Sequence, residues 1–195
     1  PAHLAWAQSN ASFAHNRRTK GGPVDHDLPV MVAKDLAGKL RAVYLSYACH
    51  CTTLSHNRIS GDWAGYAQES IQQRHPSAIA LMSVGCGADS NPVRGEGTQD
   101  EVAAIHGREI GAKVARLLQQ KLRPLSGPLN VMFSTIDLHL APLPSRAEWE
   151  RRAQRDADRG GTVGFHARVH LNRLDRGELL KTKVPLPVQT WRFGS

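Results

Sequence analysis

Two short stretches of the chain gather residue types that carry out chemistry in proteins. The first, residues 49–62, places His50 between two cysteines and continues with hydroxyl side chains, a second histidine and an aspartate. The second, residues 85–92, is rich in glycine and contains Ser90. Imidazole is the commonest zinc ligand, and zinc needs three or four converging donors. His50 is therefore our first candidate for a metal ligand, with a hydrogen-bonded core histidine as the alternative.

The three cysteines offer a second kind of chemistry, nucleophilic catalysis by a cysteine–histidine pair. Cys49 and His50 are adjacent, and successive side chains of an extended chain point to opposite faces, so these two do not suit such a pair. Cys86 meeting His50 across neighbouring strands stays open as a minor alternative. A thiolate metal site at Cys49 and Cys51 is disfavoured, because such sites usually have at least two intervening residues.

Four further side chains are candidates for site roles, and each has a plain structural alternative. Ser90 is a nucleophile or a substrate contact, although its neighbours are typical of a turn. Asp62 supports a metal site or caps a helix, and capping is favoured. The guanidinium fork of Arg17, or of the adjacent arginine, suits a carboxylate or an oxyanion. His56 is expected to be an exposed loop residue that can touch a substrate.

Apolar periodicity predicts alternating strands and helices, which indicates an α/β fold with a mixed β-sheet and flanking helices. Strands are expected over Leu28–Ala33, Leu40–Ala48, Ala78–Val84, Pro128–Leu140 and Pro187–Phe193. Helices are expected over Trp63–Arg74, from Thr98 to about Leu122, and over Ser145–Arg159. Residues 1–27 and 160–182 are expected to be irregular. His106 falls on an apolar stripe and is expected to be a core histidine.

The totals set the class of protein. We interpret residues 1–195 as a single partial domain with a soft boundary near residue 160, because both ends look cut from a longer chain. No apolar run approaches the roughly 20 residues that a membrane-spanning helix needs. The formal net charge of +8 suits anionic lipid head groups, but no aromatic-interleaved basic motif indicates nucleic-acid binding.

The segments Tyr47–Leu54 and Ile59–Ala67 resemble the metal-binding stretch of neutral/alkaline non-lysosomal ceramidases, in a compact form that looks bacterial. In that pattern a histidine followed by a small residue and two hydroxyl residues precedes Ile-Ser-Gly-Asp and a helix. Asn16-Arg17 with Val24–Asp27 is similar to the segment just upstream, and Gly87–Pro92 is similar to the family's serine loop. Order and spacing agree across roughly residues 10–120.

This resemblance implies a zinc-dependent amidohydrolase that cleaves the N-acyl amide bond of ceramide or a related acyl-amide. His50 would be a zinc ligand, Ser90 the active-site serine and Arg17 the arginine lining the site. Asp62, Asp89 and His56 are the candidates for supporting or substrate-contacting roles. The family's other zinc ligands, an earlier histidine and a later glutamate and tyrosine, are expected outside this chain.

The resemblance also implies a secreted or periplasmic protein, a small lipid-like substrate and contact with a membrane surface, and no cofactor other than zinc. The alternative from another class is a catalytically silent binding or structural domain. Such a domain would use its basic surface for anionic lipids or glycans.

Overall fold

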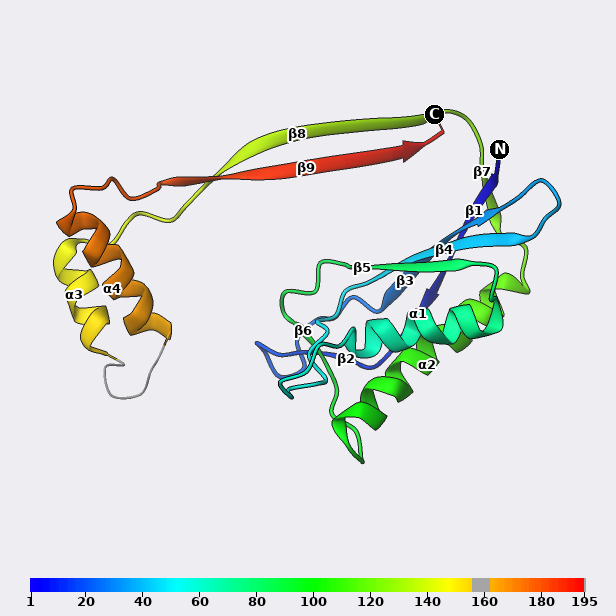
Figure 1. The fold of residues 1–195 in the computed structure, drawn as a ribbon, viewed down its shortest axis with the longest axis horizontal. Coiled ribbons are helices and arrows are strands. Elements are labelled where there is room, and N and C mark those ends of the chain that lie inside the picture. Colours follow the sequence, from blue (N-terminus) through cyan, green and yellow to red (C-terminus); the bar gives the residue numbers. More distant parts are fainter. Residues whose placement is uncertain (156–161, 195) are drawn as a thin grey trace. The chain divides into compact units, whose positions relative to one another are not determined.

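The computed structural model describes residues 1–155 and 162–194, which divide into two compact units (Figure 1). The first unit comprises residues 1–127 with Gly194, and the second comprises residues 128–193. The boundary predicted near residue 160 lies outside the described residues. The division that the structure shows falls between Gly127 and Pro128 instead.

A five-stranded mixed sheet forms the framework of the first unit, in the order β5-β4-β3-β1-β7. Its strands are β1 (His3–Asn10), β3 (Asp27–Lys34), β4 (Leu40–Tyr47), β5 (Ile79–Val84) and β7 (Arg123–Leu125). Strands β4 and β5 are parallel, and the other neighbours are antiparallel. The predicted hairpin of β3 and β4 is confirmed, as is the mixed α/β fold class. Gly38 turns the hairpin at a φ of 82°, which glycine adopts without steric strain.

Alternating apolar residues bury one face of this sheet under two helices. Leu28, Val30 and Val32 of β3 are buried, as are Val43 and Leu45 of β4. Helices α1 (Asp62–Arg74) and α2 (Gln99–Leu118) pack against each other, and Figure 1 shows both on the same side of the sheet. The alternate apolar residues of the strands and the apolar stripe of α2 therefore pack into one core.

The ends of the two helices differ from each other in how they are capped. Helix α2 begins at the predicted position, where Thr98 and Glu101 form a capping box, and it ends at Leu118, about four residues earlier than expected. The prediction that Asp62 caps α1 is wrong. Gly61 occupies the N-cap position without a side-chain cap, and Asp62 begins the helix with a φ of 52°. The Asp62 carboxylate instead binds the preceding loop.

The amino-terminal segment, predicted to be irregular, contributes β1 and the short strand β2 (Ala14–Asn16). Strand β1 has two large apolar residues, Leu4 and Trp6, followed by mostly small and polar ones, and its pairing with β3 over eight residues defines it. Strand β2 pairs with β6 (Ser90–Pro92), so that Asn16 lies opposite Ser90. This small ladder connects the segment around Arg17 with the glycine-rich loop.

The second unit consists of a two-stranded ribbon and a helical hairpin. Strands β8 (Leu129–His139) and β9 (Lys183–Phe193) pair antiparallel along their whole length. Helices α3 (Arg146–Gln154) and α4 (Thr162–Asp175) pack against each other. The expectation of irregular structure over residues 160–182 is therefore wrong for α4. The predicted helix over Ser145–Arg159 is described only to Gln154, with Ser145 as its cap, and residues 156–159 lie outside the described part.

None of the helices among the described residues combines the length and the apolar character that crossing a membrane requires.

Candidate active site

The two loops that carry the candidate residues lie at the same end of the sheet. One follows β4 and the other follows β5, and these neighbouring strands are parallel, so that their carboxyl ends meet. The backbone N–H of His50 donates to the carbonyl oxygen of Ser90 at 2.9 Å. The backbone N–H of Gly85 also donates to the carbonyl of Tyr47 at 3.0 Å. The structure thus brings together the two stretches that the sequence singled out.

The carbonyl oxygen of Ala88 is the point on which three candidate segments converge. His50 Nε2 lies 3.3 Å from this oxygen, and Arg17 Nε donates to it at 3.1 Å. The backbone N–H of Arg17 also donates to the carbonyl of Asp89 at 2.7 Å. Ser90, the residue after Asp89, is 2% exposed. An imidazole, a guanidinium and the serine loop are therefore held within one hydrogen-bonded network.

Glycine at position 87 makes this close approach of the two loops possible. A Cβ atom at position 87 would lie 2.5 Å from the carbonyl carbon of Ala48 and 2.6 Å from the amide nitrogen of Cys49. Both contacts are with backbone atoms, which cannot rotate away as a flexible side chain can. Only glycine lets the serine loop lie directly against the backbone that carries His50.

Asp62 and Trp63 hold the His50 loop from the start of α1. The indole Nε1 of Trp63 donates to the carbonyl of His50 at 2.8 Å, and this side chain is fully buried. The Asp62 carboxylate accepts from the backbone N–H of Leu54 at 2.8 Å and from that of Trp63 at 2.7 Å. Its left-handed φ of 52° is unusual for a residue other than glycine. Asp62 therefore orders the loop through the backbone.

A polar pocket of about 540 Å³ opens beside this network. It draws its lining from both loops, from β2 and from α2: His15, Thr52, Thr53, Ser55, Asn91, Pro92, Val93, Arg94 and Gln99. Thr53 Oγ1 and Asn91 Oδ1 are buried and have no hydrogen-bond partner among the described residues. Buried oxygens of this kind are usually satisfied in native proteins, so a ligand with hydrogen-bond donors fits here.

Sequence reasoning did not find Thr53, Asn91, Arg94 or Gln99 as pocket residues. Asn91 directly follows Ser90, and Thr53 belongs to the segment around His50, so the sequence motifs already included both residues. Their lack of partners is a property of the folded chain that no local pattern encodes.

The remaining candidates lie around the edge of the site. Asp89 Oδ2 accepts from Asn16 Nδ2 at 3.0 Å, which ties the serine loop to the segment of Arg17. His56, expected to be exposed, is half-buried, and its Nε2 lies 3.5 Å from a carboxylate oxygen of Asp100 on α2. Arg58 binds the same carboxylate at 3.1 Å. His56 therefore faces the start of α2 within the described structure.

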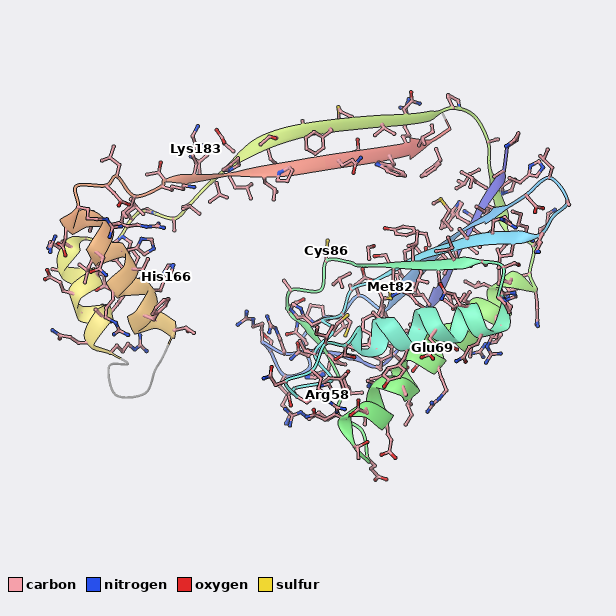
Figure 2. All side chains as sticks on the ribbon, in the orientation of Figure 1. Arg58, Glu69, Met82, Cys86, His166 and Lys183 are labelled. Atoms are coloured by element: carbon pink, nitrogen blue, oxygen red, sulfur yellow. The ribbon has the colours of Figure 1, made fainter. Side chains whose placement is uncertain are left out.

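The surroundings of His106, Cys49 and Cys86 bear on three of the sequence-based expectations. His106 is 5% exposed, stacks on Phe13 with ring centroids 4.3 Å apart, and lies 3.0 Å from the carbonyl of Val93, so its predicted core role is confirmed. Burial raises the pKa of the Cys49 thiol to about 12. A catalytic cysteine needs a lowered pKa, so this geometry disfavours a Cys49 nucleophile. Cys86 is exposed beyond the end of β5 (Figure 2).

The described residues do not provide a complete zinc centre. No group of three or more histidine, cysteine, aspartate or glutamate side chains within the described part of the chain is arranged to hold a metal ion. At the candidate site His50 offers one imidazole, whereas zinc in proteins takes three or four donors. A zinc ion at this position would need donors from outside residues 1–155 and 162–194.

Comparison with known proteins places this fold. No protein-family model and no curated protein matches the sequence. The neutral ceramidase from Pseudomonas aeruginosa matches all of this chain with a TM-score of 0.68 at 17% identity, over 39% of its own length. A ceramidase complexed with C2 matches with a TM-score of 0.69 at 18% identity, over 40% of its length. The chain, which spans about two fifths of these structures, thus has the fold of part of a neutral ceramidase.

Proposed function

We propose that this chain forms part of a hydrolase that cleaves the N-acyl amide bond of ceramide or a related acyl-amide. The observation that carries the proposal is the convergence of His50 and Arg17 on the Ala88 carbonyl, next to Ser90 and beside a polar pocket. The ceramidase fold of the chain supports the same activity.

Zinc is the proposed cofactor, and His50 is the ligand that this chain would contribute. Bound zinc lowers the pKa of a water molecule to about 7 and polarises an acyl carbonyl. The described residues supply one zinc donor at this site. The hydrogen bonds that join the His50 backbone to Ser90 and to the Trp63 indole fix the position of His50, which supports its role as a zinc ligand.

Arg17 is proposed to stabilise the negative charge that develops on the acyl oxygen. Its Nε is bound to the Ala88 carbonyl, which fixes the plane of the guanidinium and leaves the fork of terminal nitrogens for an oxyanion. Ser90 is proposed to position the substrate from the adjoining loop. The buried oxygens of Thr53 and Asn91 would accept hydrogen bonds from hydroxyl or amide groups of the substrate.

The test uses the complete protein that contains this chain, with zinc content and acyl-amide hydrolysis measured on the same preparations. His50→Ala is expected to lose both the metal and the activity. His26→Ala is the matched control, because His26 is an exposed histidine of the same unit, and this variant should keep both. Stoichiometric zinc in the His50 variant would contradict the ligand assignment.

Two further variants separate the roles of the other residues. Ser90→Ala should lower turnover and leave the metal bound, and full activity would reduce Ser90 to a turn residue. Arg17→Lys keeps the charge but loses the guanidinium fork, so it should lower turnover without changing metal content. A variant as active as the wild type would contradict the oxyanion role.

A second candidate function, binding without catalysis, rests on the net charge of +8. A basic surface attracts anionic lipid head groups, and the attraction weakens as salt screens it. Salt-sensitive association with anionic vesicles by a protein that holds no zinc and hydrolyses no amide would favour this alternative.

A further inference from the structure

A pair of histidines on α4, far in sequence from the candidate active site, has the arrangement of a metal-binding pair. His166 and His170 are four residues apart on the helix, so they lie on one face, one turn apart. Their Nε2 atoms are 3.3 Å apart. Figure 2 shows His166 on the helical hairpin of the second unit.

The separation of the two nitrogens matches the geometry of a shared ion. Two imidazole nitrogens about 2.0–2.1 Å from a tetrahedral zinc ion are roughly 3.3–3.4 Å apart. The observed distance of 3.3 Å therefore needs no rearrangement of the backbone to accommodate one ion between the rings. The alternative occupant of the gap is a proton, shared when one neutral imidazole donates its N–H to the other.

The packing of α3 on α4 holds the two rings in place and leaves one side accessible. Trp149 of α3 is 6% exposed and contacts both histidines, with ring centroids 4.7 Å from His170 and 6.3 Å from His166. His170 is half-buried and His166 is exposed. An ion can therefore reach the pair from solvent, while the tryptophan restricts the rotamers of the rings from behind.

The surrounding charge narrows the class of ion. The guanidinium of Arg152 lies 5.3 Å from the centre of the Trp149 ring, and Arg168 and Arg173 flank the pair on α4. Hard cations such as Ca²⁺ or Mg²⁺ are held by anionic oxygens. Among the described residues no aspartate or glutamate joins the two histidines in a group of three metal-ligating side chains. Ions of the Cu²⁺, Ni²⁺ and Zn²⁺ group bind neutral imidazole strongly enough to tolerate positive neighbours.

We propose that His166 and His170 bind one divalent transition-metal ion through their Nε2 atoms, with solvent in the remaining coordination positions. This site is independent of the proposed ligand His50. It would join two successive turns of α4 and thereby stabilise the helical hairpin.

The experiment titrates the complete protein that contains this chain with Cu²⁺ held by iminodiacetate, whose free coordination positions suit a pair of imidazoles better than a single one. Binding is followed by isothermal calorimetry, and nitrogen coordination by electron paramagnetic resonance. The wild type should bind one equivalent tightly, and His166→Gln should weaken that binding at least about tenfold, because a second linked donor raises the effective concentration at the ion. His139→Gln, which changes a histidine of the same unit, should leave the tight equivalent unchanged.

A spacing control keeps the number of histidines and changes only their arrangement. Phe165→His combined with His166→Gln places the two histidines five residues apart, on different faces of α4, and Phe165 is 63% exposed, so the fold should tolerate the change. This variant should bind as weakly as His166→Gln. Equal tight binding by the wild type and the spacing variant, or tight binding retained in His166→Gln with unchanged far-ultraviolet circular dichroism, would overturn the proposal.

Discussion

Replacing Gly107 with alanine tests the packing that supports the candidate site. Gly107 lies on α2 where this helix crosses α1, and an added Cβ would lie 2.4 Å from the Cβ of Tyr66. Two further contacts, each 2.7 Å, are with the backbone of Tyr66 and Ala67. Because ordinary van der Waals contact begins at 3.4 Å, the two helices would have to separate by about 1 Å.

The expected loss of stability follows from two opposing effects. Overpacking of a tight interior costs about 1–3 kcal/mol, and the upper end applies because the neighbouring atoms belong to a helix backbone. Alanine favours the helix over glycine by about 1 kcal/mol. The free energy of unfolding should therefore fall by about 2 kcal/mol, the difference between these effects.

Urea unfolding followed by circular dichroism measures this change against a matched control. Gly65 of α1 is also helical, and a Cβ there would meet nothing within 4 Å. Gly65→Ala should therefore show the favourable helix effect alone and raise stability by up to about 1 kcal/mol. If Gly107→Ala is as stable as the wild type, this result would contradict the close crossing of α1 and α2 that the structure shows.

Two further predictions concern the ends of these helices. Asp62→Ala should lower the free energy of unfolding, measured in urea, by about 3 kcal/mol, because the N–H groups of Leu54 and Trp63 lose a charged acceptor. Asp62→Asn keeps an acceptor oxygen and should lose less stability. Equal losses in the two variants would contradict the hydrogen-bond argument. Hydrogen bonds from the backbone and hydroxyl of Thr98 lower the pKa of the Glu101 carboxyl, so its contribution to stability is present above the ordinary carboxyl pKa and is lost as the pH falls through the lowered value. Unfolding measured between neutral and acidic pH should therefore show a weaker pH dependence in Glu101→Gln than in the wild type, and identical profiles would contradict the capping box.

The sequence predicted the elements whose amphipathic pattern and end signals agree. Strands β3, β4 and β5 have buried apolar residues, and α2 has both a capping box and a continuous stripe. Strand β1 was missed because Leu4 and Trp6 are its only large apolar residues, which is too short a pattern to predict a strand, and its partners in the sheet define it. Helix α4 was missed because glycine, histidine and β-branched residues weaken its local helix preference.

The site was predicted in part for the same reason. Placing His50 and Ser90 together required only that β4 and β5 be neighbours, and the parallel pairing of the two strands provides it. The left-handed backbone of Asp62 and the partnerless oxygens of Thr53 and Asn91 depend on contacts between distant segments. Local propensity cannot report such contacts, because each arises only when the loops meet.

The pairing of Leu129 with Phe193 determines how residues 128–193 could be replaced by protein engineering. The chain leaves the first unit after Gly127 and returns at Gly194, and the ladder from Leu129↔Phe193 to His139↔Lys183 keeps the outgoing and returning strands side by side. The two ends of residues 128–193 therefore adjoin each other. A short reverse turn from Gly127 to Gly194 in place of this segment would leave unchanged the register of β4 and β5, the strands that carry the two candidate-site loops.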